Sequence, residues 1–579
     1  MLIPFILTLI YSAVGLVIMA LVARAAWRRR NPPAPADDSA SRAYAESGPG
    51  ITNRWLRGAR VLAVSALAAV FFMHSYWLFW ADSSKQYVQA KRLDARNRRL
   101  GESGLKGWVL DRTGKLENAL IRYRSTGGLI ARDYPLGPAG VHLTGYSDFV
   151  FGAGGIEHAY RDWLTESASI TNALLSPIPV GKDLKVSIDS NLQRDVFNLI
   201  DGTGKPAAAV VLLLPNNEVL AMASSPSFNP RAITDEKTWR QMSTQAEATP
   251  TRSPLVNRAL GTLVTGGPAF YYRPGSTFKT FVAGVAIDCG ITGEKFTCKP
   301  DGFTPPGSAR PIRDYGGESH GTIGLDEAFK VSCNQYFAQL GLKLGRQRLA
   351  QYAERLGFAD SPGDEPSRSL NLWQVLHGDK GDFEFIFAPP GPRMNLSPSA
   401  SSYDLALQSI GQGFDDATVM SMALLASVAA SSDGALAAPT FEFGATRKVV
   451  STFITPQSAA RLRTLMRSVV ESGTAAGAFA SRRGSVTAGG KTGTADRDVL
   501  VYDREGQPLV SYRDKDGDPV YKTERWTDAW FIGYAPAENP QIAYAVLVEN
   551  GGQGARATVP IAVQIIERAA ARGYVNLKH

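Results

Sequence analysis

The chain has 579 residues, with 62 Lys and Arg against 53 Asp and Glu, and three cysteines. Hydrophobic residues make up 44% and charged residues 20%, so a large core can form and wholesale disorder is excluded. Three cysteines exclude a disulfide-dense scaffold and argue against a multi-cysteine zinc or iron–sulfur site. The length predicts more than one folding unit.

Two apolar runs near the N-terminus are each long enough to cross a bilayer. Leu2–Ala23 is continuous and lacks the basic start of a signal peptide, and Val61–Trp80 ends in an aromatic cluster. We therefore predict transmembrane helices over residues 1–23 and 61–80, the alternative for each being a buried core helix.

The stretch between these runs, residues 24–60, has eight arginines against three acidic residues. By the positive-inside tendency it is predicted to be a cytoplasmic linker, which places the N-terminus and everything after Trp80 on the outer, periplasmic side of the plasma (inner) membrane. Because much of the chain's +9 net charge lies here, a broad nucleic-acid-binding face is not supported.

The outer region divides by composition into two parts. Residues 81–182 are predicted to be a basic stalk and a small, turn-rich, β-rich pedestal module, and residues 183–579 a larger domain. In the larger domain, apolar periodicity predicts an α/β (α+β) fold, with a sheet flanked by helices from both ends of the domain. The expected strands are 207–214, 218–223, 529–534 and 542–549, and the expected helices are 276–289, 325–344, 347–357 and 557–572. The polar, Asp/Arg-rich stretch 496–525 is predicted to be a loop over the edge of the site.

Three short sequences carry candidate chemistry, the first being Arg273-Pro274-Gly275-Ser276-Thr277-Phe278-Lys279. Pro-Gly before Ser276 predicts a turn into a helix, whose positive end favours a developing alkoxide. Lys279 follows by three residues, on the same face, where a lysine can serve as base for a serine nucleophile. Alone the pattern is weak, because about two Ser-x-x-Lys matches are expected by chance in a chain of this length.

The second is Ser332-Cys333-Asn334, inside the apolar stretch 325–344. Ser and Asn are poor residues for a helix interior, so they either face a cleft or mark a helix end. The third is Lys491-Thr492-Gly493-Thr494, which offers a cation, hydroxyl donors and approachable backbone N–H groups suited to a substrate carboxylate and an oxyanion. Its spacing differs from that of a phosphate-binding loop.

Together, and in this order, the three sequences are typical of class A β-lactamases and penicillin-binding proteins. The chain resembles a class B penicillin-binding protein, a monofunctional D,D-transpeptidase of peptidoglycan synthesis, over roughly residues 105–575. Further stretches carry the same resemblance: Gly107–Gly114, Gly154–Glu157, Ser187–Asp189, Leu220–Ser224, His320–Thr322, Gly411–Gly413, Gly473-Thr474 and Trp530–Tyr534.

The resemblance implies a mainly antiparallel sheet and a role for each residue. Ser276 attacks the stem peptide, Lys279 takes its proton, Ser332 relays a proton to the leaving amine, and Asn334 orients Lys279 and the substrate. Lys491 supplies positive potential, while Thr492, Gly493 and Thr494 bind the substrate carboxylate. The backbone N–H groups of Ser276 and Thr494 form the oxyanion hole. β-Lactams are expected to acylate Ser276.

No cofactor is implied and no metal is predicted, since the six histidines show no ligand spacing. The implied partners are peptidoglycan stem peptides, membrane lipid, and a polytopic glycosyltransferase of the shape, elongation, division and sporulation (SEDS) family. A serine β-lactamase and a non-catalytic β-lactam-sensing receptor or scaffold remain as alternative functions. Asp528 departs from the family pattern, in which a histidine often stands there, and two membrane spans replace the usual one.

The cysteines leave one question open. Cys289 and Cys298 lie nine residues apart on the outer side, and either a disulfide or a reduced, buried pair is compatible with that spacing. Cys333 is expected to pack inward as a small hydrophobic residue.

Overall fold

The computed structural model describes residues 105–577 apart from 127–128, 149–151, 167–180, 235, 249, 266–270, 358–393, 395, 397–399, 414–415, 483–485, 504–506 and 516–517. Before residue 105 it describes a few helical positions: Leu21, Arg24, Val64, Ser65, Ala68, Phe72 and Met73. The two membrane helices, the linker and residues 81–104 of the stalk thus lie almost wholly outside the described residues and stay predictions. Within the described part, no helix has the length and apolar character needed to cross a bilayer.

The chain divides into two units, Met1–Gly104 and Leu105–His579, and the second is built on one five-stranded sheet. Its strands run in the order β15 (Gly489–Leu500), β18 (Thr523–Ala535), β19 (Ile542–Val548), β7 (Ala207–Leu213) and β8 (Glu218–Ser225), and every neighbouring pair is antiparallel. The predicted antiparallel sheet, made of strands from both ends of the domain, is confirmed. Every residue of β8 and β19 is buried, so both faces of the sheet are covered.

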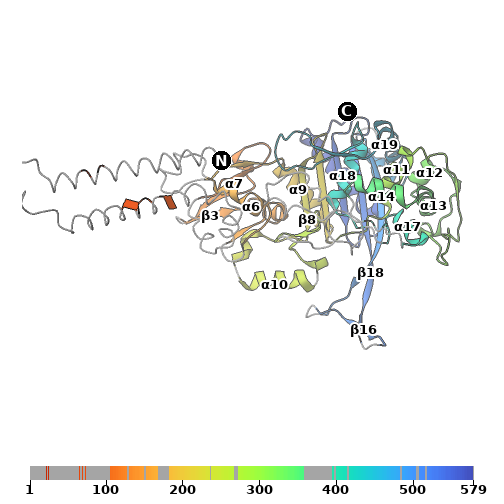
Figure 1. Ribbon diagram of the computed structural model, residues 1–579, viewed down its shortest axis with the longest axis horizontal. Helices are drawn as coiled ribbons and strands as arrows, with labels where there is room; N and C mark the ends of the chain where they lie inside the picture. The colour runs from red at the N-terminus through yellow and green to blue at the C-terminus, as the bar shows by residue number, and fades with distance from the viewer. Residues whose placement is uncertain are drawn as a thin grey trace, which may run out of the picture. The chain divides into compact units, whose positions relative to one another are not determined.

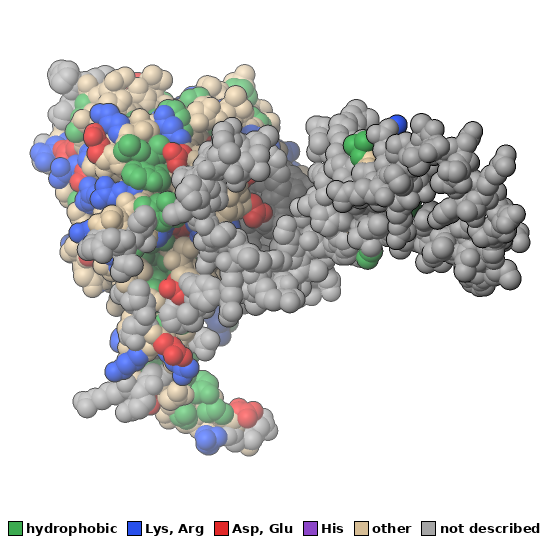
Figure 2. All heavy atoms as spheres, turned by 90° about the vertical axis from the view of Figure 1, so that its left-hand side faces the viewer, with side chains coloured by type: hydrophobic (Ala, Val, Ile, Leu, Met, Phe, Trp, Pro, Cys, Tyr) green, Lys and Arg blue, Asp and Glu red, His purple; other side chains and the backbone are tan. Residues whose placement is uncertain are grey.

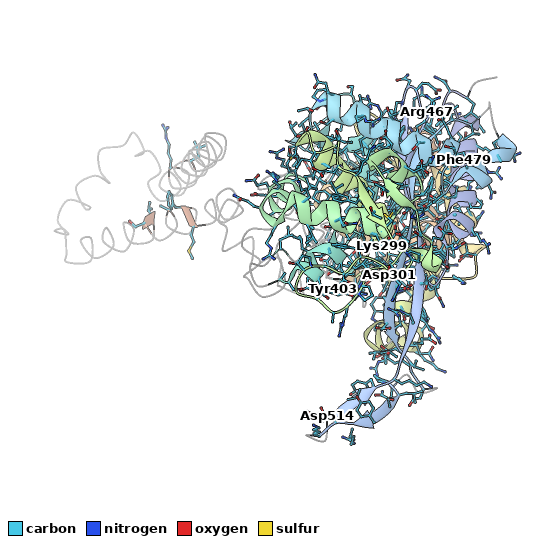
Figure 3. The ribbon with its side chains drawn as sticks, turned by 90° about the vertical axis from the view of Figure 1, so that its right-hand side faces the viewer. Lys299, Asp301, Tyr403, Arg467, Phe479 and Asp514 are labelled. Atoms are coloured by element: carbon cyan, nitrogen blue, oxygen red, sulfur yellow. The ribbon has the colours of Figure 1, made fainter. Side chains whose placement is uncertain are left out.

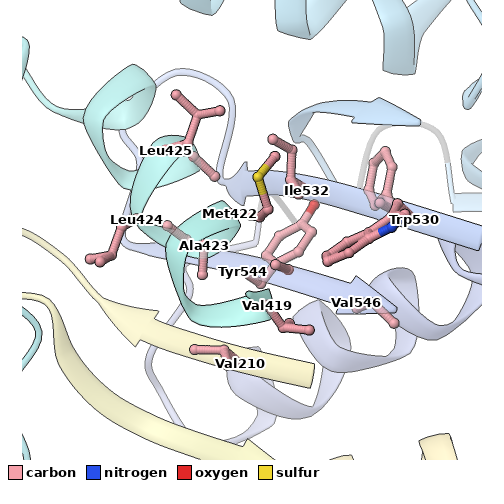
Figure 4. Packing of buried hydrophobic residues seen from close by; sticks show 14 of the residues in the cluster. Val210, Val419, Met422, Ala423, Leu424, Leu425, Trp530, Ile532, Tyr544 and Val546 are labelled. Atoms are coloured by element: carbon pink, nitrogen blue, oxygen red, sulfur yellow. The ribbon is translucent and has the colours of Figure 1, made fainter. Parts of the chain in front are cut away.

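Helices cover the two faces of the sheet (Figure 1). On one side, α9 (Ser190–Asp201) packs against β7 and β8 and meets α22 (Val559–Ala571), which also contacts β19. On the other side, the almost wholly apolar α18 (Val419–Ala430) lies on β7, β18 and β19, with Met422 and Val419 beside Ile532, Tyr544 and Trp530 (Figure 4). Burying a helix of this composition on a buried sheet supplies much of the hydrophobic driving force for the fold.

The predicted helices around the site are largely present, with one correction. The segment 276–289 forms a 3-10 turn, η6 (Gly275–Phe278), followed by α11 (Lys279–Asp288), and 347–357 forms α14 (Arg346–Arg355). The single helix predicted over 325–344 is wrong: α12 (Leu325–Lys330) and α13 (Asn334–Leu344) are separated by a break. Ser332 has a φ of 62°, a left-handed conformation that a continuous right-handed helix does not contain.

The remaining elements surround this core. In the small module, β1 (Val109–Leu110) pairs in parallel with β6 (Leu184–Lys185), and β2 (Arg122–Thr126) pairs with β3 (Leu129–Asp133). The others are β4 (Ser147–Asp148), β5 (Gly152–Ala153), α5 (Val141–Thr144), α6 (Gly155–Ala159), α7 (Arg161–Thr165), α10 (Glu236–Ala248), β9 (Val256–Asn257), β10 (Thr262–Leu263), β11 (Phe296–Cys298), β12 (Gly321–Ile323), α17 (Ser402–Gln408), β13 (Ala435–Ala437), β14 (Val449–Thr452), α19 (Pro456–Glu471), α20 (Ala476–Phe479) and α21 (Gly554–Ala557).

The loop predicted over 496–525 is wrong, because the described residues of this stretch form a projecting β-ribbon that we call the arm. Strands β15 and β18 stay paired out to Leu500 and Thr523, and β16 (Val510–Arg513) pairs with β17 (Pro519–Tyr521) beyond them. Figure 1 shows the ribbon leaving the body, and Figure 3 places Asp514 at its far end. Hydrophobic and charged side chains are mixed over it (Figure 2). The apolar runs of this ribbon are short and stand among many charged residues, so its composition is that of a loop although its backbone is paired.

Candidate active site

The turn that carries Ser276 is fixed by close backbone contacts. Gly275 has a φ of 54°, and its N–H donates to the carbonyl of Gly411 at 2.9 Å. A Cβ on Gly275 would lie 2.5 Å from the carbonyl oxygen of Thr494, so only glycine fits. In a 3-10 turn, side chains three apart lie above one another, which stacks Ser276 and Lys279 on one side. Ser276 is half-buried and Lys279 is fully buried.

The ammonium group of Lys279 points at the break between α12 and α13. Its Nζ lies 2.6 Å from the carbonyl oxygen of Ser332, 2.7 Å from Oδ1 of Asn334 and 3.3 Å from Oγ of Ser332. Burial lowers the pKa of Lys279 to about 8, although the nearby Asp314 acts in the opposite direction. A neutral amine has two N–H groups for the carbonyl and the amide oxygen, and keeps a lone pair to accept a hydroxyl proton.

Asp314 holds Asn334 in this orientation, although no sequence pattern had pointed to it. Its carboxylate accepts hydrogen bonds from the backbone N–H groups of Asn334 and Gln335, and so caps the first turn of α13. The Asn334 Nδ2 donates to the carbonyl of Arg313 at 2.9 Å, so Oδ1 is left to face Lys279. The segment 313–314 therefore positions the second of the three predicted sequences.

Lys491 reaches the same hydroxyl from the sheet. Its Nζ is 2.8 Å from Oγ of Ser332 and 3.0 Å from the carbonyl of Thr492. Burial, together with the charge of Lys279, lowers the pKa of Lys491 well below its ordinary value. Two buried ammonium groups on one hydroxyl repel each other, so the pair favours a single positive charge. Ser332 thus bridges two amines, an arrangement through which a proton can pass.

The strand that follows Lys491 lies against the Ser276 turn. Thr492 Oγ1 is 2.6 Å from Oγ1 of Thr474, and a Cβ on Gly493 would lie 2.8 Å from Cγ2 of Thr277. The carbonyl of Thr494 packs on Gly275. Because β15 is an edge strand of the sheet, alternate backbone N–H groups along it are free to face this turn. The three predicted sequences therefore meet at one place, and Thr474 and Asp314 join them.

The structure decides between the two possibilities for Cys289 and Cys298. All three thiols are free, so the reduced alternative is confirmed and the disulfide is contradicted, although Cys289 is only half-buried. The Sγ atoms of Cys298 and Cys333 lie 2.9 Å apart, whereas Cys289 Sγ contacts the Tyr352 hydroxyl at 3.8 Å. Cys333 is fully buried, as expected.

These thiols also correct the argument that few cysteines leave no metal-ligating cluster. One ligand atom each from Cys298, Asp314 and Cys333 lie within 4.8 Å of one another, and all three residues are buried. Nδ1 of His320 lies 3.4 Å from the Asp314 carboxylate. Two thiols and a carboxylate are ligands that could hold a thiophilic divalent cation, and His320 is not part of this group of three. Cys298 and Cys333 are 35 residues apart in sequence, so no local spacing announces the cluster.

The acylation rate of this site is expected to depend on pH through Lys279. Only the neutral amine can take a proton, so with a pKa of about 8 the rate rises roughly tenfold per pH unit below that value and levels off above it. The second-order rate of covalent labelling by a fluorescent penicillin, measured from pH 5.5 to 9.5, checks this. A flat profile across that range would contradict a lysine base.

Residues 207–567 match the family model for the penicillin binding protein transpeptidase domain. Among similar proteins, the peptidoglycan D,D-transpeptidase MrdA of Acinetobacter baumannii is 27% identical over 439 residues, covering 73% of this chain and 58% of MrdA. The peptidoglycan D,D-transpeptidase PbpA of Mycobacterium tuberculosis is 29% identical over 423 residues, covering 68% of this chain and 73% of PbpA. The aligned part thus spans less than two thirds of MrdA.

Solved structures agree with these matches. The crystal structure of PBPA from Mycobacterium tuberculosis aligns with a TM-score of 0.62 at 25% identity, covering 81% of this chain and 100% of that one. The penicillin G acyl-enzyme complex of penicillin-binding protein A from the same organism aligns with a TM-score of 0.61 at 25% identity, with the same coverage. With the family model matching more than half of its length, the chain belongs to the penicillin-binding protein transpeptidase family, as a class B penicillin-binding protein.

Proposed function

We propose that this protein is a membrane-anchored peptidoglycan D,D-transpeptidase that cross-links stem peptides through an acyl-enzyme on Ser276. The observation that carries the proposal is the chain of Lys279 Nζ, Ser332 Oγ and Lys491 Nζ beside the Ser276 turn. The names of the relatives, which are peptidoglycan D,D-transpeptidases, and the penicillin G acyl-enzyme of a related structure support it.

In the first half-reaction, neutral Lys279 takes the hydroxyl proton of Ser276 while Oγ attacks the carbonyl carbon of the penultimate D-Ala. The carbonyl oxygen becomes an oxyanion and accepts hydrogen bonds from the backbone N–H groups of Ser276 and Thr494. The proton then passes from Lys279 through the Ser332 hydroxyl to the nitrogen of the terminal D-Ala, and the C–N bond breaks. Free D-Ala leaves, and the stem peptide stays esterified to Ser276.

In the second half-reaction, the amine of a neighbouring stem peptide attacks the ester carbonyl, and the C–O bond to Ser276 breaks. The proton of the amine returns along the same path to Oγ of Ser276, which leaves the amide cross-link and the free enzyme. Before acylation, the carboxylate of the terminal D-Ala lies on the hydroxyls of Thr492 and Thr494, beside Lys491. The site has two buried lysines, so this carboxylate supplies a compensating negative charge and favours the protonated form of Lys491. β-Lactams acylate Ser276 by the same attack on their ring carbonyl.

A pulse-chase experiment separates this function from its alternatives. Purified protein is labelled with a fluorescent penicillin, the free label is removed, and the covalent band is followed for hours. We expect a stable band, together with dimeric stem peptides when lipid-linked disaccharide pentapeptide and a glycan polymerase are supplied. Label loss within seconds to minutes would identify a β-lactamase, and stable label without cross-linked product would identify a receptor or scaffold.

The membrane placement and the partner are part of the same proposal. Residues 1–23 and 61–80 anchor the protein in the plasma membrane, residues 24–60 lie in the cytoplasm, and the catalytic domain acts on the periplasmic side. A polytopic glycosyltransferase of the SEDS family supplies the glycan strands. The resemblance to class B penicillin-binding proteins supports this partner, and its copurification from a detergent extract is the direct test.

A further inference from the structure

A buried network of four ionised side chains lies behind the site and has no part in the mechanism above. Arg258 Nε is 2.7 Å from Oε1 of Glu549, and Arg497 reaches Oε2 of Glu549 and the carboxylate of Asp528, each at 2.5 Å. The side chains of Arg258 and Glu549 are wholly buried, and that of Arg497 is 14% exposed. Two arginines against two carboxylates balance in charge. A network of this kind is a poor source of stability, because desolvation offsets most of the attraction.

The two oxygens of Glu549 connect the two halves of the site. Oε1 accepts the hydroxyl of Tyr272 at 2.9 Å, and Tyr272 lies four residues before Ser276. Oε2 accepts Arg497, which lies three residues after Thr494 on β15. The path Tyr272–Glu549–Arg497 therefore joins the nucleophile turn to the substrate-binding strand by side chains alone.

Two further bonds run alongside this path. Nη1 of Arg273 donates to the carbonyl of Asp496 at 3.0 Å, and the Trp530 indole N–H donates to the carbonyl of Arg273 at 3.0 Å. Asp496 and Arg497 are the first two residues of the arm, where β15 pairs with Thr527 and Trp526 of β18. The guanidinium of Arg497 also lies over the rings of Tyr272 and Trp526, at 5.6 Å and 5.3 Å from their centroids.

From this arrangement we propose that Arg497 is a positioning residue that, through Glu549 and Tyr272, sets the spacing between the backbone N–H groups of Ser276 and Thr494. The inference rests on the proposed function, because those two groups form the oxyanion hole. Donors aimed at a developing oxyanion are effective only at a hydrogen-bond distance from its final position. A shift of β15 relative to the turn moves the Thr494 N–H away from the oxyanion position and weakens stabilisation of the transition state. The hydroxyls of Thr492 and Thr494 move together on the same strand, so they can still bind the ground-state carboxylate.

The test separates binding from acylation in the kinetics of a chromogenic cephalosporin, using the full chain in detergent. Arg497→Met is expected to lower the acylation rate constant about 10–100-fold. This loss is part of the roughly 10²–10³-fold that one oxyanion donor contributes. The Kd of the complex that precedes acylation should stay within about twofold of that of the unchanged protein. The midpoint of the pH profile should stay near that of the unchanged protein, because Lys279 is untouched. Lys522→Met is the matched control: Lys522 lies on the same arm, is exposed, and is expected to leave every constant unchanged.

Tyr272→Phe provides a second test of the same path, since it removes one hydroxyl without changing the charge of the buried network. It is expected to lower the acylation rate constant several-fold, and its effect should not add to that of Arg497→Met, because both break the same path. If folded Arg497→Met and Tyr272→Phe proteins acylate at the original rate and only their Tm falls, the network is merely structural and the inference is wrong. Absence of acylation in the unchanged protein would instead overturn the proposed function.

Discussion

Replacing Ser276 with alanine is expected to abolish covalent labelling by a fluorescent penicillin, with a loss of at least about 10⁴-fold in the acylation rate. The hydroxyl is the atom that forms the bond, and the surrounding amines and N–H groups have nothing to activate without it. The substitution removes one oxygen from a half-buried position, so the fold and the positions of Lys279 and Thr494 should persist. Labelling is measured by in-gel fluorescence, with thermal unfolding as the check on folding.

Ser472→Ala serves as the control for this variant. Ser472 is an exposed serine that follows α19, and its removal should leave labelling unchanged. A covalent band that survives in Ser276→Ala would show that another residue is the nucleophile. Its position would then be identified by mass spectrometry of the labelled peptide.

Replacing Lys279 with methionine is expected to lower the acylation rate about 10²–10⁴-fold, the range that a positioned general base contributes. Methionine has a similar length and no proton to exchange, so it fills the buried position without a charge. The pH profile should change as well. The charge of Lys279 is one cause of the lowered pKa of Lys491, so in Lys279→Met the pKa of Lys491 should move back toward its ordinary value. Residual activity should therefore lose its dependence on a group titrating near pH 8.

Lys343→Met is the control, because Lys343 lies on the same helix, α13, but near its C-terminal end, away from the break, is 55% exposed and pairs with Glu294. Its acylation rate and pH profile should match those of the unchanged protein. If Lys279→Met acylates within about threefold of the original rate, the base lies elsewhere, and Lys491 would be the next residue to replace.

Local sequence was enough to predict most helices and strands and to identify the catalytic segments. Periodicity predicted the strands at 207–214 and 542–549 and the helix at 557–572, because a buried strand or an amphipathic helix repeats its apolar residues over a few positions. The Pro-Gly pair before Ser276 predicted the turn, since a left-handed φ at Gly275 is a local property of the backbone. The same local rules failed for the arm, where both faces are solvated and short apolar runs stand among many charged residues.

The tertiary structure decided how distant segments meet. Cys298 and Cys333 lie 35 residues apart, and Tyr272 and Glu549 lie 277 apart, yet each pair is in contact. Asp314 belongs to no recognisable motif. Its role in positioning Asn334 is seen only in the structure, where its carboxylate caps the first turn of α13. Such contacts depend on the order of strands in the sheet and on the packing of helices against it, which are sums over many weak interactions along the whole chain. A single sequence records each short segment's preference for helix, strand or turn, but not which buried charge will find which partner.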